Sequence, residues 1–116
     1  TARKVVEHLL HSVAMSLTDP CNPSGCLAVQ GALTCSQAAD SIKQELCKRR
    51  SEGEDNLRKR FERAKSEGDL GSDSDPGALA RYVITVTQGM SVQASGGATR
   101  SDLLTVVDMA LKAWPA

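Results

Sequence analysis

Three helix start and stop signals in the second half of the chain constrain its fold more than any other feature. Asp75-Pro76 supplies a helix cap and then a proline at the first turn, where the missing amide proton costs nothing. Gly96-Gly97 ends that helix, and Thr99 to Asp102 opens another as a capping-box variant, with Asp in place of the usual Glu or Gln. The sequence therefore predicts two consecutive helices joined by a very short loop, the second running to Trp114.

The first half of the chain predicts three more helices. Apolar residues at i, i+3, i+4 and i+7 indicate a helix from Ala2 to Leu17, followed by a loop with two prolines and a glycine over residues 19–25. Cys26 to Thr34 is almost uniformly apolar or small, which favours a short helix buried on most sides. A long helix then begins at Ser36 and ends at Gly68, with Leu70 placed to pack back against its last turn.

The long helix has one apolar stripe and many charges. Nine cations and five anions lie between its apolar positions, and we interpret them, Arg50 included, as a solvated surface. The stripe consists of Ile42, Leu46, Gly53, Leu57, Phe61 and Ala64.

Size and composition favour one all-α domain. A chain of 116 residues forms a single unit with one core, and an oligomer interface would add materially to the stability of so small a protein. Aromatic residues make up only 3% of the chain, so the core must be built from aliphatic side chains on helices. The expected architecture is a bundle of five helices in orthogonal and antiparallel arrangement.

Charge and hydropathy exclude two classes of partner. Fourteen basic and fourteen acidic residues give a formal charge of zero, so we do not expect this chain alone to hold DNA. No apolar run approaches the ~20 residues that cross a bilayer, and the N-terminus does not read as a signal peptide, so we expect a soluble, cytoplasmic protein. Because the chain starts at Thr1, inside a helical pattern, we interpret it as a fragment whose upstream part is missing.

Chemistry-bearing residues form no recognisable catalytic or metal-binding constellation. No nucleophile elbow, phosphate-cradling loop or isolated carboxylate pair is present, so an enzyme is not expected. His8 and His11 share one face of the first helix, where we interpret them as rim residues. The four cysteines are Cys21, Cys26, Cys35 and Cys47, and their spacing matches no common zinc site. Neither a metal nor a cofactor is therefore expected, and core packing is the favoured role of most of these cysteines.

The order of these segments resembles the C-terminal, effector-binding and dimerisation domain of TetR-family transcriptional repressors. Each segment is short, but together they cover nearly the whole chain from Gly25 onward. They are Gly25 to Gln30, Ala64 to Leu70, Asp75 to Arg81, and Gln88-Gly89-Met90 with Gly96.

The resemblance implies a function. In the family, a helix-turn-helix domain precedes this region and reads DNA, and nothing in these residues looks like one. The last two helices would pair with those of a second copy as a four-helix bundle, and the preceding helices would enclose a cavity for a small, largely apolar effector. The scarcity of aromatics argues against broad recognition of planar drugs.

Candidate site residues fall into two sets. The pocket set lies at the boundary between apolar and polar faces of the first four helices: Leu10, Val13, Leu27, Gln30, Phe61, Tyr82, Thr85 and Gln88. The homodimer set combines the two apolar faces of the last helix with the stretch that carries no charge after Arg81: Val86, Met90, Ala94, Leu103, Val107, Ala110 and Trp114.

Gln30, Thr85 and Gln88 lie beside apolar stripes, where an unpaired amide or hydroxyl costs ~1–3 kcal/mol, so a partner for each is expected. No charged residue is expected inside the stripes, and the effector is therefore predicted to be neutral.

Two rival functions stay open at this point. A purely structural dimerisation module would have the same helices without a cavity. A small thiol-dependent enzyme would need one cysteine activated by a neighbouring base.

Overall fold

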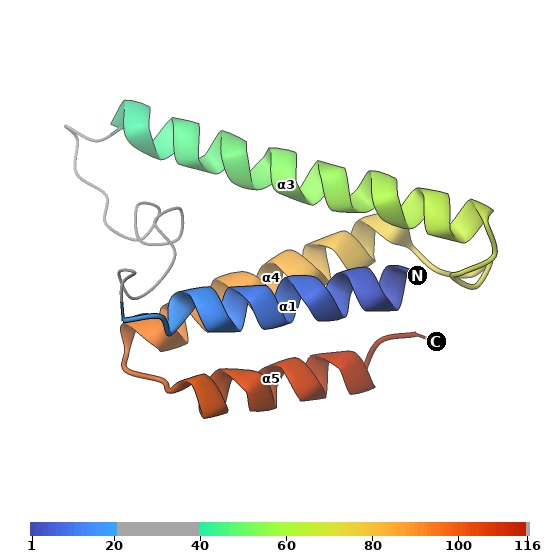
Figure 1. Cartoon of the computed structure of the whole chain (residues 1–116). Helices are drawn as coiled ribbons and strands as arrows, with labels where there is room; N and C mark the ends of the chain where they lie inside the picture. The colour runs from blue at the N-terminus through green and yellow to red at the C-terminus, as the bar shows by residue number, and fades with distance from the viewer. Residues whose placement is uncertain (21–39, 116) are drawn as a thin grey trace.

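The computed structural model describes residues 1–20 and 40–115, and the regular structure within these ranges is entirely helical. The helices are α1 (Ala2–Leu17), α3 (Asp40–Ser66), α4 (Pro76–Ser95) and α5 (Arg100–Lys112) (Figure 1). Four of the five predicted helices are therefore confirmed. The fifth, predicted over Cys26 to Thr34, lies outside the described residues. None of the four described helices combines the length and apolar character needed to cross a membrane.

Helix α1 has the predicted bounds. Its first turn is capped by the Thr1 hydroxyl, which accepts a hydrogen bond from the Lys4 amide at 3.2 Å. Beyond its last turn, the Thr18 hydroxyl donates to the carbonyl of Ala14 at 2.7 Å. The buried side of the helix recurs every fourth residue, at Ala2, Val6, Leu10 and Ala14.

Helix α3 ends as the glycine predicts. Gly68 adopts a φ of 81°, in the left-handed region that side chains disfavour, and this reverses the chain. The amides of Asp69 and Leu70 then donate to the carbonyl of Ala64 at 2.9 and 3.2 Å. Leu70 is 3% exposed, which confirms that it packs back against the helix it follows.

Helices α4 and α5 form the predicted hairpin. The Asp75 carboxylate accepts from the Ala78 amide at 3.1 Å, and the capping box is complete, with Thr99 and Asp102 exchanging hydrogen bonds of 3.2 and 2.8 Å. Helix α5 ends at Lys112, two residues before the predicted Trp114. Pro115 explains the difference, because a proline disfavours helical backbone at the residue before it.

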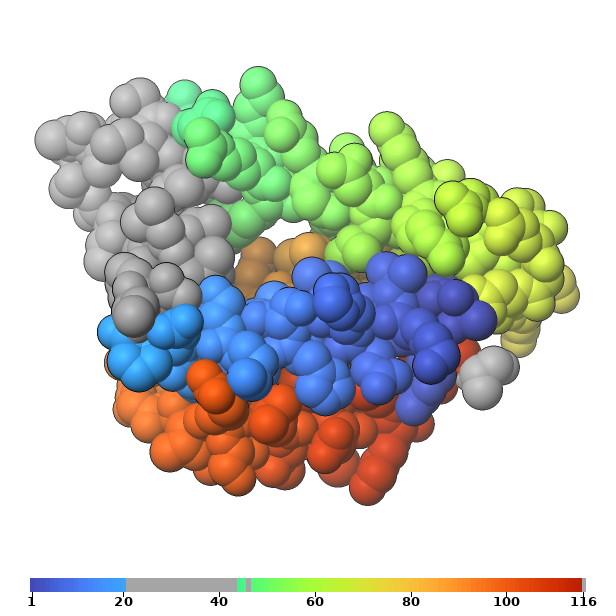
Figure 2. Space-filling model, viewed as in Figure 1, coloured from blue at the N-terminus to red at the C-terminus, as the bar shows by residue number. Residues whose placement is uncertain are grey.

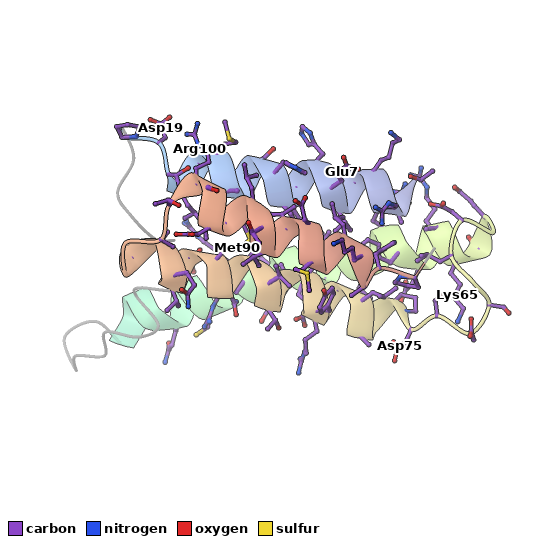
Figure 3. All side chains as sticks on the ribbon, turned by 90° about the horizontal axis from the view of Figure 1, so that it is seen from below. Glu7, Asp19, Lys65, Asp75, Met90 and Arg100 are labelled. Atoms are coloured by element: carbon purple, nitrogen blue, oxygen red, sulfur yellow. The ribbon has the colours of Figure 1, made fainter. Side chains whose placement is uncertain are left out.

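The helices are arranged around one core. Helix α3 packs mainly on α4, whereas α1 lies against α5 and α4. Figure 1 shows that the distance between α1 and α3 increases toward the N-terminal end of α3. We call this wedge-shaped arrangement of α1, α3 and α4 the wedge. Seen from below, Met90 lies between α4 and α5, and Arg100 at the start of α5 reaches the end of α1, where its Nε donates to the Thr18 hydroxyl at 2.9 Å (Figure 3).

Candidate functional site

The wedge between α1, α3 and α4 is closed at one end by tight packing. The amide of Ala2 donates to the Asp69 carboxylate at 2.6 Å, which fixes the start of α1 to the segment after α3. A guanidinium nitrogen of Arg3 donates to the carbonyl of Leu111 at 2.8 Å, which joins α1 to α5. Phe61 is fully buried at this end and belongs to the hydrophobic core.

At the other end of the wedge, the described parts of α1 and α3 lie farther apart. Figure 2 shows an opening between α1 and the first half of α3, with α4 visible behind it. On the α1 side, Val13 and Leu17 are only partly buried, although both pack against the core. On α3, Leu57 lies just past the middle of the helix, is partly buried and packs against the core. Small-molecule sites are usually lined mainly by apolar side chains, with a few polar groups.

Two contacts fix how α3 and α4 pass each other. Arg81 of α4 forms an ion pair with Glu54 of α3 at 3.5 Å, and Gly77 lies against the side chain of Arg58. From the contact of Gly77 with Arg58 to the ion pair of Arg81 with Glu54, the residue number decreases on α3 and increases on α4. The two helices are therefore antiparallel, and earlier turns of α3 lie beside later turns of α4.

Arg50 corrects the expectation that α3 carries its cations only on the solvent side. Arg50 precedes Leu57 by seven residues, which is two helical turns, so the two residues share one face. The side chain is half-buried, and its Nε is fully shielded from solvent. Assigning the nine cations of this helix to one surface missed that Arg50 continues the apolar stripe, a spacing that was visible in the sequence.

The predicted pocket residues are spread over more than one environment. Leu10 and Phe61 are buried in the core, at 1% and 0% exposure, and Val13 is partly buried beside it. Tyr82 packs on the core and its hydroxyl donates to the carbonyl of Ala110 at 3.4 Å, toward α5 rather than α3. Leu27 and Gln30 lie outside the described residues.

The polar residues of α4 find different partners. Thr85 is exposed, and its hydroxyl donates to the carbonyl of Arg81 at 2.7 Å, so its expected partner is its own helix backbone. Gln88 is half-buried. The more deeply buried polar residue was not predicted: Ser91 is 3% exposed, and its hydroxyl donates to the carbonyl of Thr87 at 3.0 Å.

The predicted dimer set lies largely inside the subunit. Six of its members are at most 6% exposed in the single chain, and Val86 is partly buried. Side chains already buried against their own subunit have little surface left for a partner. The six are Met90, Ala94, Leu103, Val107, Ala110 and Trp114.

A different face of the α4–α5 hairpin carries exposed apolar side chains. Val92 is 44% exposed, Val106 42% and Met109 62%. Because Tyr82 of α4 bonds to Ala110 of α5, these stretches of the two helices run side by side. Single exposed apolar residues are ordinary, but neighbouring ones on two adjacent helices mark a surface suited to a partner.

The two histidines lie on the outer surface of α1. His8 and His11, with Lys4 and Glu7, line a shallow open depression of about 330 Å³. Nδ1 of His11 lies 2.8 Å from the carbonyl of Glu7, one turn earlier in the same helix. Within residues 1–20 and 40–115, no three His, Cys, Asp or Glu side chains are placed to hold a metal ion.

Comparison with known proteins shows the family and the fold of the chain. Residues 3–102 match the family described as "Tetracyclin repressor-like, C-terminal domain". The HTH-type transcriptional repressor ComR of Escherichia coli (strain K12) is 26% identical over 104 residues, which are 90% of this chain and 50% of ComR. The chain thus spans about half the length of that curated relative.

Two solved structures have the same fold. Both are of the TetR family transcriptional regulator CifR, as cysteine mutants complexed with 26 bp double-strand operator DNA. They are 37% and 38% identical to this chain, each with a TM-score of 0.92, and the match covers 99% of this chain and 60% of theirs. With most of its length matching the family's C-terminal domain, the chain belongs to the TetR family of transcriptional regulators.

Proposed function

We propose that this chain is the ligand-sensing and dimerisation domain of a repressor that releases DNA when a small, mostly apolar effector binds. The observation that carries the proposal is the wedge, which is closed and packed at Phe61 but open between α1 and the first half of α3. Its relatives are transcriptional regulators, and one of them, CifR, has been solved twice in complex with operator DNA. A protein that acts on an operator works in the cytoplasm of a bacterium.

The mechanism follows from linkage between two sites. An effector that fills the wedge binds one separation of α1 and α3 more tightly than another, and it shifts the population toward that arrangement. In a protein that carries a DNA-reading segment ahead of α1, the same shift changes the distance between the two recognition helices of a dimer. The affinity for the operator then falls by the difference in effector binding free energy between the two arrangements.

The proposed homodimer uses α4 and α5, as the sequence predicts, but a different face of them. The face consists of Thr85, Gly89 and Val92 on α4 with Val106 and Met109 on α5, all of which are exposed in the single chain. A side chain added at Gly89 would meet nothing within 4 Å, so the glycine leaves a flat place where a second helix can approach. Pairing this face with its copy buries apolar surface that the subunit itself leaves in water.

Ligand sensing is tested by melting the purified chain with a panel of hydrophobic compounds. A compound at 100 times its dissociation constant should stabilise the fold by ~2.7 kcal/mol, which raises the melting temperature by roughly 10 °C. If no compound shifts the melt while the chain still sediments as a dimer, the purely structural dimerisation module is the better account.

Release of DNA is tested with a longer form of the protein that carries a DNA-binding segment. A compound that stabilises this domain should weaken operator binding in a fluorescence anisotropy titration. A stabilising compound that leaves operator affinity unchanged would contradict the coupling, though not the binding of the ligand.

A further inference from the structure

Arg50 lies in the first half of α3, on the helix face that also carries Leu57 and Phe61. It precedes Phe61 by eleven residues and Leu57 by seven, so it continues the line of core side chains by two to three turns. Phe61 is fully buried, Leu57 is partly buried, and Arg50 is half-buried. A cation therefore occupies a place that the helical pattern reserves for an apolar residue.

The hydrogen bonds of this guanidinium leave one edge almost unused. Its Nη2 donates to the sulfur of Cys47 at 2.9 Å, and sulfur is a weak acceptor. Its Nε is buried and has no hydrogen-bond partner. Nε and Nη2 point from the same edge of the planar group, and that edge matches the two oxygens of a carboxylate.

Two carboxylates of α3 near Arg50 form ion pairs with other arginines, and a third, Glu52, is exposed. Glu54, one turn after Arg50, pairs with Arg81 of α4 at 3.5 Å. Glu45 pairs with Arg49 at 3.3 Å on the exposed side of α3. Within the described part of the chain, no ion pair involves Arg50. Since a partly buried charge without a counterion opposes folding, the unpaired edge of Arg50 needs a reason other than stability.

We propose that Arg50 binds a carboxylate of the effector, so that the ligand is an apolar molecule with one carboxylate at its end. This inference rests on the proposed ligand-sensing function and names its ligand class. The carboxylate accepts two parallel hydrogen bonds from Nε and Nη2, and the apolar body lies along the wedge toward Leu57 and Val13. This ligand carries a charge, whereas the sequence predicts a neutral effector.

The test compares straight-chain monocarboxylates from acetate to dodecanoate with the primary alcohols of the same lengths. Binding to the purified chain is measured by calorimetry and by the shift in melting temperature. We expect at least one carboxylate to bind on the order of tenfold or more tightly than its alcohol, the gain typical of a charge-assisted hydrogen bond. The R50Q variant should bind that carboxylate and its alcohol with affinities within about twofold of each other, because the amide lacks the charge.

Two control variants separate Arg50 from its surroundings. R49Q removes an exposed cation from the neighbouring position and should keep the preference for carboxylates. R60Q removes another arginine of α3 with a buried, unpaired nitrogen, but one beside Phe61 at the closed end, and it should also keep the preference. Loss of the preference in either control would overturn the assignment to Arg50.

A further variant distinguishes a ligand-binding role from a structural one. With no ligand present, R50L should melt at the same temperature as the wild type or higher, because leucine fits the apolar stripe and removes an unpaired charge. A clearly lower melting temperature would show that the guanidinium supports the fold, and it would overturn the proposal.

The remaining outcomes are distinguishable. If carboxylates and alcohols bind equally at every length, the proposal for Arg50 fails while ligand sensing stands. The same holds if other hydrophobic compounds bind but no carboxylate does. If no compound of any class binds, both the ligand-sensing function and the role of Arg50 are contradicted.

Discussion

The ring of Phe61 meets the ring of Trp114 edge to face, with centroids 5.3 Å apart and planes inclined by 60°. This pair joins the second half of α3 to the residues just after α5, and both side chains are at most 5% exposed. The sequence assigned Phe61 to a ligand pocket and Trp114 to a dimer interface. In the structure they form one core contact, at the end of the wedge where the helices pack together.

Replacing Phe61 with alanine should lower the free energy of unfolding by ~3–5 kcal/mol, because it removes a fully buried ring and its contact with Trp114. Urea denaturation of the wild type and the variant measures this. Met15→Ala, at a side chain 45% exposed on α1, is the matched control and should change stability much less. A Phe61→Ala loss below ~1 kcal/mol would show that the ring is not part of a packed core.

Replacing Val92 or Met109 with glutamate should convert a dimer to a monomer without unfolding it. Both side chains are largely exposed, so the charge is tolerated in the single chain but would be buried in the proposed interface. Sedimentation velocity at tens of micromolar, a concentration that detects even weak pairs, measures the assembly state.

Met15→Glu places the same charge at a similarly exposed apolar residue on α1 and should leave the dimer intact. A wild-type chain that is monomeric at these concentrations would contradict the homodimer. Dissociation by Met15→Glu alone would place the interface on α1.

Two glycines of the α3 region should respond oppositely to alanine. Gly68 has a φ of 81°, so Gly68→Ala forces a side chain into the left-handed region and should destabilise the fold by about 1 kcal/mol. Gly53 lies inside α3, and a side chain there would meet nothing within 4 Å, so Gly53→Ala should stabilise it by ~0.5–1 kcal/mol. Thermal melts of both variants test this prediction. If both substitutions change the stability in the same direction, the assigned backbone conformations are contradicted.

The cap of α5 should give stability a dependence on acidic pH. Hydrogen bonds from the backbone and side chain of Thr99 hold the pKa of Asp102 below its ordinary value of 3.8. A lowered folded-state pKa means that the contribution is present above about pH 3.8 and is lost as the pH falls through the folded value.

Asp102→Asn tests this cap, because its amide oxygen accepts the same hydrogen bond but does not titrate. The difference in unfolding free energy between wild type and variant should therefore shrink as the pH falls from 5 toward 2, a range set by the lowered pKa. If this difference in unfolding free energy does not change with pH, the titration of Asp102 in the cap does not contribute to the pH dependence of stability. Thr99→Ala should cost about 1 kcal/mol at neutral pH, since it removes the other half of the capping box.

Local sequence signals fix the end of α3 and the starts of α4 and α5. The bond from Ala78 to Asp75, the box of Thr99 and Asp102, and the reversal at Gly68 each join residues within a few positions of one another. Such bonds are encoded locally, so they form in the same way whatever the helices later pack against.

Only the tertiary structure decided which face of each helix is buried and by what. Met90 and Val107 lie on apolar stripes that suit either a core or an interface, and the packing of α4 on α5 put them in the core. Arg50 stands among exposed cations in the sequence, but packing half-buries it and shields its Nε from solvent. The helical period gives the direction of a side chain around its own axis, but its neighbours come from contacts between residues far apart in the chain, such as Ala2 with Asp69.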